Sequence, residues 1–480
     1  MNTHNMKHIR LSLTLFLAFI SLILSVSQLS AQKLNSLYFL DQTPIHTRLN
    51  PAMTPKSSGF GIGISNVSFY AQSDLAFDDL FFPNEDELNW FLDPDIDKTE
   101  FLNSLNEVTS FRTGFNMELI TLGIRIKSLY FTFHSGINMD MGMGLPKDIF
   151  SFAMLGMEPD GTTVFDYTDL SIDAMLYNKT GLGFSAKIGN MVSIGANVDY
   201  LAGLANMRVG FDEFTISASD EKWDVVSKGY LQFAGPKELE LAYSESGFLN
   251  GINQTFSSTY GSSMDFSQLP IAGNGLSFDL GVVVRPLSFL TLSAAVSDLG
   301  FIHWKKEYIQ KAASDGVFTF DGIDDLSIGG SEDETESGEE ESSTDQLMEE
   351  ITDMTHFEKQ TITEGYSTSL TTKINLAAEA GILKNHLTLG VLSQTGFAST
   401  GVYNDVMVSA NLKPGSLIQT AFTYSLLHGE MSSFGAALNV KLLFLNLFLA
   451  ADYIPLRYSP QLIPISNSYF NTQFGFNFMF

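Results

Sequence analysis

The regularly placed ionisable residues of this chain stand in segments where apolar and polar residues alternate. Asp199 lies within such a run, Val192–Tyr200, and Asp279 lies within another, Leu276–Val284. Alternate residues of a strand face opposite sides of a sheet, so these charged groups are predicted to share one side. Charges gathered there could pair with one another and fill an interior. The polar residues predicted on this side are His134, Asp199, Asp279, Arg285, His303, Lys373, Glu379, Lys441 and Asp452.

Histidine, a common general base, forms no recognisable catalytic pattern. None of the eight histidines stands in a known nucleophile or metal motif. In Phe301–Trp304, the alternation places Trp304 on the outward, apolar side, as part of an outer aromatic girdle. It places His303 on the inward side. A hydrolase using a Ser and a His at the edge of a barrel lumen stays open as an alternative. We expect no enzyme, and we predict no catalytic, cofactor-binding or metal-ligating residue.

The densest acidic run, Glu332 to Glu350, has ten acidic residues and no basic one. A calcium loop needs spaced carboxylates and a turn glycine, which the run lacks. The pattern favours a solvated external loop over about 312–365. The net charge of −28 argues against nucleic acid or anionic lipid as a partner.

Amphipathic alternation predicts fourteen strands. They are Gly59–Gln72, Phe111–Ile126, Leu129–Met141, Asn178–Ile188, Val192–Val209, Leu276–Arg285, Leu290–Trp304, Tyr366–Ile382, Leu387–Phe397, Tyr403–Leu412, Leu417–Leu426, Phe434–Leu442, Leu447–Ile454 and Asn471–Phe480. Short and longer connections alternate between them, and hairpin-like pieces within Gly210–Gly275 could add a strand pair. This is the plan of an all-β, transmembrane antiparallel barrel with long external loops, spanning residues 58–480.

The first residues resemble a secretory signal. Lys7 and Arg10 precede an apolar run, Leu11–Leu24, that is too short to span a membrane comfortably, and small residues lead to Ala31. Residues 1–31 are therefore predicted to be a signal peptide. The chain has no cysteine, so disulfides and thiolate metal sites are excluded.

Residues 32–57 contain Pro44, Pro51 and Pro55, which rule out a regular strand ladder. Asn50-Pro51-Ala52 resembles the N-terminal segment of long-chain fatty-acid transporter (FadL-like) barrels and of the barrel of type IX secretion. An ordinary turn before the first strand is the alternative. We predict that residues 32–57 are a plug inside the barrel, on its periplasmic side.

The last strand places Phe474, Phe476, Phe478 and Phe480 on one face. As an exposed edge of a water-soluble protein this face would invite aggregation, whereas it suits a strand that closes a membrane barrel. Its Gln473, Gly475, Phe478 and Phe480 resemble the C-terminal signal that the outer-membrane barrel assembly machinery reads. That resemblance implies the assembly machinery and outer-membrane lipid as partners.

From Asn50-Pro51-Ala52, through Arg285–Leu287 and Ser297–Trp304, to the terminal strand, the chain resembles an uncharacterised family of Gram-negative outer-membrane barrels, a domain of unknown function. Such families are grouped loosely with FadL-like barrels. The resemblance implies a barrel of about 14 strands with an N-terminal plug, located in the outer membrane, and brings no catalytic residues.

Two functions fit these observations. One is a barrel that transports or binds a small hydrophobic molecule, although the ionic interior is more charged than a greasy conduit would require. The other is a structural or secretion-associated barrel that docks envelope proteins through its long acidic loops. The sequence does not name a ligand, a protein partner or an oligomeric state.

Overall fold

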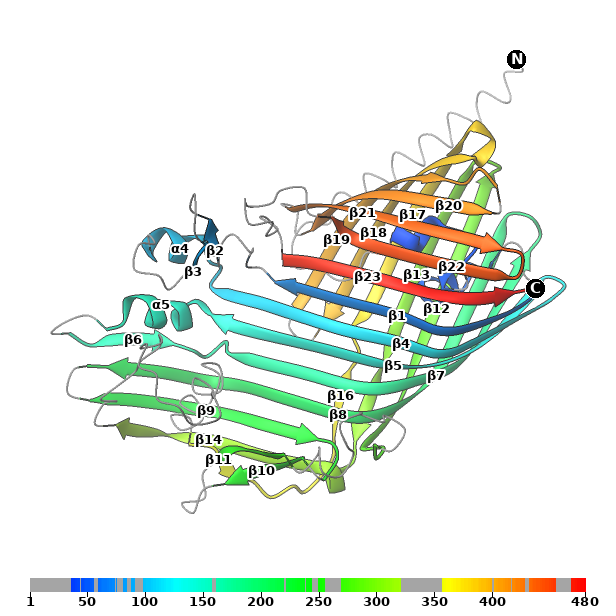
Figure 1. Cartoon of the computed structure of the whole chain (residues 1–480). Helices are drawn as coiled ribbons and strands as arrows, with labels where there is room; N and C mark the ends of the chain where they lie inside the picture. Colours follow the sequence, from blue (N-terminus) through cyan, green and yellow to red (C-terminus); the bar gives the residue numbers. More distant parts are fainter. Residues whose placement is uncertain are drawn as a thin grey trace, which may run out of the picture.

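The computed structural model describes residues 36–480 except 44, 56–58, 74, 76–80, 84–87, 91–97, 158–160, 220–221, 238, 244–248, 255–268, 321–355, 399–400, 416, 428–430 and 455–467. Fourteen antiparallel strand positions form a closed barrel (Figure 1), which confirms the predicted fold class. The terminal strand β23 (Ser468–Met479) pairs with both β22 (Leu445–Ile454) and β1 (Phe60–Ser73), and so closes the ring.

The other positions of the wall follow in chain order from β1. They are β4 (Val108–Ile126), β5 (Leu129–Pro146), β7 (Ser171–Ile188), β8 (Val192–Ala218), β12 (Gly273–Leu287), β13 (Leu290–Trp304), β16 (Tyr366–Ser369) with β17 (Thr372–Ile382), β18 (Leu387–Ala398), β19 (Gly401–Leu412), β20 (Ile418–Leu427) and β21 (Met431–Leu442). Because β16 and β17 both pair with β13, they share one position.

The two sides of the wall differ as the alternation predicts. In β12, Leu276 and Phe278 are exposed on the outer side, whereas Ser277 and Asp279 are buried. In β23, Phe474 is 49% exposed, and its neighbour Gln473 is buried. The barrel is therefore apolar outside and polar inside, the reverse of a water-soluble protein.

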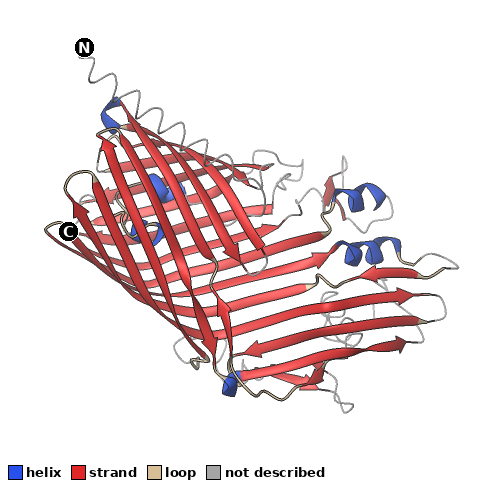
Figure 2. Ribbon diagram, turned by 180° about the vertical axis from the view of Figure 1, so that it is seen from behind, coloured by secondary structure: helices blue, strands red, loops and turns tan. Residues whose placement is uncertain are grey.

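Beyond the ring, β8 continues past its predicted end at Val209 and forms an extension with β9 (Trp223–Ala234) and β14 (Ile309–Phe320). Figure 2 shows these strands reaching past the rest of the wall. The predicted loop over 312–365 is therefore wrong at its start, because residues 312–320 belong to β14. The acidic run Glu332 to Glu350 lies outside the described residues.

The remaining elements are short. They are η1 (Ser36–Phe39), α2 (His46–Leu49), β2 (Phe81–Pro83), β3 (Leu88–Trp90), α4 (Lys98–Ser104), α5 (Lys147–Leu155), β6 (Thr163–Asp166), β10 (Leu239–Tyr243), β11 (Leu249–Gln254), η2 (Lys306–Tyr308), β15 (Glu358–Lys359) and η3 (Leu383–Asn385). Within the described ranges, no helix is long and apolar enough to cross a membrane.

A bulge in β13 changes which of its residues face inward. Asp279 of β12 stands opposite both Ser297 and Asp298, because the pairing shifts between Phe278 and Leu280. Asp298 has φ +59°, a left-handed conformation that aspartate tolerates better than most residues. The extra residue reverses the alternation for the rest of the strand.

The predicted orientations of His303 and Trp304 are therefore wrong. Trp304 is fully buried, and its indole N–H donates to Thr368 at 2.8 Å. His303 is exposed, and its Nδ1 lies 3.1 Å from the Ser367 hydroxyl. The sequence prediction carried a single parity through the whole strand and did not allow for the bulge at Asp298.

Candidate functional site

The described residues 36–43 and 45–55 lie inside the ring of strands, where Figure 1 shows their two short helices in blue. The apolar ones pack on small or apolar residues of the inner wall. Tyr38 and Phe39 pack with Ala377 of β17 and Met407 of β19. Leu37, Leu40 and Ile45 form a second cluster with Ala421, Ala437, Phe448 and Ala450. These described residues, 36–43 and 45–55, form the N-terminal segment, which contacts several wall strands at once.

Two glycines of the wall let the segment approach closely. A Cβ atom on Gly195 of β8 would overlap the Pro51 carbonyl, and one on Gly281 of β12 would overlap the Asn50 amide oxygen. Any larger residue at either position would need the segment to move. The wall therefore accommodates the segment in this place.

Asn50 fastens the segment to the wall. It is fully buried, its Oδ1 accepts the Ala52 N–H at 2.9 Å, and its Nδ2 donates to the Ala294 carbonyl at 3.2 Å. From the wall, Asn197 donates to the Thr47 carbonyl at 3.4 Å. The first contact is an Asx turn, a structure for which asparagine is favoured. Asn50-Pro51-Ala52 thus has a local structural role.

A cluster of buried charges lies in the wall beside this segment. Lys179 of β7 places its Nζ 2.9 Å from Asp199 of β8, 3.5 Å from Asp279 and 2.7 Å from Asp298. The Nε2 of His134 in β5 lies 2.8 Å from Asp199. Burial of a charge is costly unless partners compensate it, and here one ammonium group serves three carboxylates. The bulge at Asp298 is what brings the third carboxylate to Lys179.

The other predicted inward residues are more dispersed. Lys373 lies 3.4 Å from Asp298. Glu379 contacts Lys413 instead, at 2.5 Å. Arg285 donates to Ser193 at 3.4 Å, Asp452 accepts the Ser36 backbone N–H at 2.8 Å and the Asn471 side chain at 2.6 Å, and Lys441 is half-buried at the inner side of β21.

Several functional candidates were missed by sequence reasoning. Lys179 has the inward parity of its strand, so the alternation alone could have found it. Glu118 stands beside a bulge of β4 where the inward parity changes, so the alternation did not fix its side. Arg48, which pairs with Glu118 at 3.1 Å, stands in a short helix of the N-terminal segment. No strand alternation covers that position. Within the part of the chain that the structure describes, no group of acidic and histidine side chains is arranged to hold a metal ion.

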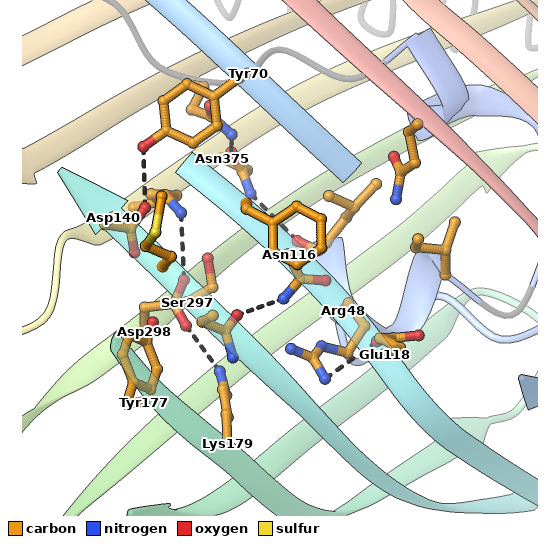
Figure 3. Close-up of a pocket in the computed structure, with 18 residues that line it drawn as sticks. Arg48, Tyr70, Asn116, Glu118, Asp140, Tyr177, Lys179, Ser297, Asp298 and Asn375 are labelled. Atoms are coloured by element: carbon orange, nitrogen blue, oxygen red, sulfur yellow. Dashed lines mark hydrogen bonds and ion pairs between the residues drawn. The ribbon is translucent and has the colours of Figure 1, made fainter. Parts of the chain in front are cut away.

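A cavity of about 110 Å³ adjoins both groups of charges. We call it the amide cavity, because five amide side chains line it: Asn116, Asn138, Asn375, Gln394 and Gln473. Figure 3 shows that Lys179 reaches Asp298 and Arg48 reaches Glu118 beside it. The lining is predominantly polar, with Tyr70, Phe115 and Tyr177 as its aromatic surfaces.

A second cavity of about 70 Å³, the turn-side cavity, lies on the other side of the N-terminal segment. Arg285 and Thr291, which flank the β12–β13 turn, line it together with Glu379. The segment contributes His46 and Met53 to this cavity, and Ile45 and Arg48 to the amide cavity. The segment therefore separates two cavities of the barrel interior.

Comparison with solved structures found transporters and a FadL homologue at low sequence identity. The toluene transporter TbuX of Ralstonia pickettii is 8% identical, with TM-score 0.43, covering 92% of this chain and 94% of that one. The toluene transporter TodX of P. putida is 8% identical, with TM-score 0.35, over 89% and 90%. A Pseudomonas aeruginosa FadL homologue is 10% identical, with TM-score 0.38, over 91% and 93%.

No curated protein matches the chain. A family model does match, over residues 51–452, which is most of the chain and includes both Pro51 and the wall strands up to β22. The family resemblance inferred from the sequence is thereby confirmed. The chain belongs to the family of unknown function (DUF5723).

Proposed function

We propose that this protein is a barrel of the Gram-negative outer membrane whose interior holds or passes a small molecule, and that its N-terminal segment is the plug. The apolar outer side of the wall supports the membrane location, because lipid-facing residues of such barrels are apolar and lumen residues are polar. At the short-turn rim, Phe444 stacks with Phe480 at 5.8 Å between ring centroids, as in an aromatic girdle. The short turns are proposed to face the periplasm.

The observation that carries the proposal is the position of the N-terminal segment between two cavities. A barrel of about eight strands is just filled by its own side chains, so a wider barrel encloses space that something else must occupy. Here the segment occupies it, and the amide and turn-side cavities remain on either side. Movement of the segment would join them into a path along the barrel.

The nature of the small molecule follows from the lining. The predicted hydrophobic solute would require mostly apolar walls, as small-molecule sites usually have. The amide cavity has charged and amide side chains instead. The lining therefore favours a polar solute. Toluene is named for the transporters TbuX and TodX, and we do not assign it to this chain.

The plug is tested by a variant that displaces it. Gly195→Val places side-chain atoms where the Pro51 carbonyl lies, so the segment must move. We expect proteoliposomes with this variant to swell faster in an uncharged sugar such as arabinose than those with the natural sequence. The matched control is Gly415→Val, because nothing lies within 4 Å of a Cβ atom there. Unchanged swelling with a folded Gly195→Val barrel would refute the proposal.

One observation favours the docking function as a second candidate. The extension β8–β9–β14 projects beyond the ring and has its own hydrophobic clusters, with Phe214 and Trp223 in one and Leu231 and Phe357 in another. A packed extension of this kind is more than a loop, and an envelope protein could bind it. Removal of the extension should then release a co-purifying partner and leave arabinose permeability unchanged.

A further inference from the structure

We propose that the amide cavity is a binding site for a small, uncharged, polyhydroxylated molecule, a polyol about the size of glycerol. This inference rests on the proposed holding or passage of a small molecule and names its chemical class. The lining decides the class through its charges, the free donor of Asn138 and its volume.

The charged side chains of the lining already have partners. Arg48 pairs with Glu118 at 3.1 Å, and Asp298 receives both Lys179 at 2.7 Å and Lys373 at 3.4 Å. Asp140, the sixth charged residue of the lining, accepts a hydrogen bond from the Tyr70 hydroxyl at 2.9 Å. An ionic ligand would have to compete with these contacts. An uncharged ligand would leave them in place.

Asn138 supplies the free group. Its side chain is buried, with 9% exposure, and its Oδ1 accepts a hydrogen bond from Asn116. Its Nδ2 lacks a partner among the residues that the structure describes. A buried donor without an acceptor is costly, so the site favours a ligand oxygen at this position. A hydroxyl group meets this need without bringing charge.

The volume sets the size. Liquid water takes about 30 Å³ per molecule, and a cavity of about 150 Å³ holds benzene. The amide cavity, at about 110 Å³, therefore suits a ligand with about as many heavy atoms as glycerol. Tyr70 and Tyr177 also line the cavity, and their rings supply carbon atoms that a carbon skeleton can contact.

The test compares three probes of similar size on the full chain in detergent, by saturation-transfer NMR. Glycerol carries three hydroxyls, 1-propanol has the same carbon skeleton with one, and acetate carries a charge. We expect glycerol to bind more tightly than either. Tighter binding of acetate or 1-propanol would overturn the proposal, as would binding of none of the three, which would mean that the cavity holds water only.

Asn138→Leu should weaken glycerol binding by about tenfold, which corresponds to one hydrogen bond. The control Asn411→Leu removes an inward amide of β19 that contacts Thr388 and Ser409 and lies outside the lining. If Leu at position 138 disturbs folding, Asn138→Ala, which adds no bulk, carries the same expectation. Equal glycerol binding by a folded Asn138 variant and the natural chain would overturn the assignment. Arabinose swelling of Gly195→Val reports on the plug separately, so the two proposals can fail independently.

Discussion

At the residue scale, His46 should make the plug sensitive to acid. Its ring is 3% exposed, and its Nε2 donates to the Leu37 carbonyl at 2.8 Å. Burial lowers its pKa from 6.5 to about 4, and the smaller effects of nearby charges oppose one another, since Asp41 and Glu379 raise the pKa and Lys413 lowers it. The folded state therefore favours the neutral ring. The resulting stabilisation is present above pH 6.5 and is lost as the pH falls to about 4.

The size of this effect is about 3 kcal/mol, since each unit of pKa difference corresponds to about 1.4 kcal/mol. We expect amide hydrogen exchange in residues 36–49, corrected for its intrinsic pH dependence, to accelerate over that pH interval. His46→Gln, which stays neutral, should show little change. Equal acceleration in both proteins would mean that another group titrates.

The inner residues could be predicted from the sequence where a strand runs without interruption. Asp199 and Asp279 are buried on the side that their alternation indicates. His303 is exposed instead of buried on the inner side, because the bulge at Asp298 adds a residue to β13 and reverses the alternation after it. A bulge depends on the partner strand, and nothing in the local sequence marks Asp298 as the residue with positive φ. The ion pairs themselves, such as Lys179 with Asp298, depend on register across strands and were beyond prediction.

At the scale of elements, the terminal strand carries the argument on assembly. Its alternation of rings and polar groups was predicted, and β23 closes the barrel. Sequence reasoning also located all the wall positions, because each has its own amphipathic period. It offered the hairpin-like pieces within Gly210–Gly275 as a possible extra strand pair, and the extension of β8 pairs with β9 there. It missed the strand β14, most of whose residues lie in a stretch predicted as a loop. β14 pairs with β9, which is distant in sequence, so local pattern did not identify it as part of a sheet.

Phe480 is expected to act mainly through assembly. Loss of its exposed ring removes about 2 to 3 kcal/mol of burial in lipid, which a large barrel should survive. The same loss applies to Phe278, an exposed ring in the middle of the wall. If the assembly machinery reads the terminal strand, Phe480→Ala should lower the outer-membrane level of the protein and Phe278→Ala should not. Equal membrane levels of the two variants would argue against recognition of the strand.

At the scale of the whole molecule, the barrel and its filling depend on each other. The sequence indicated a wide barrel and, through its prolines, a segment that could not join the wall. It did not indicate how that segment is held. Gly195 and Gly281 are ordinary inward residues by parity, and their role appears only when Pro51 and Asn50 lie against them. The division of the interior into two cavities is likewise a property of the assembled fold.

The acidic run Glu332 to Glu350 should be dispensable for this fold. A serine-rich stretch whose charged residues are all acidic has too little apolar surface to stabilise a packed structure. The described strands on either side, β14 and β15, already pair with each other, and the ring closes through β23 and β1. Replacement of residues 332–350 by a short Gly-Ser linker should therefore leave the heat-modifiable folded band on a gel intact. Deletion of Ser468–Met479 is the control that should abolish it. Loss of the band in the linker variant would mean that the acidic run contributes to the packed barrel.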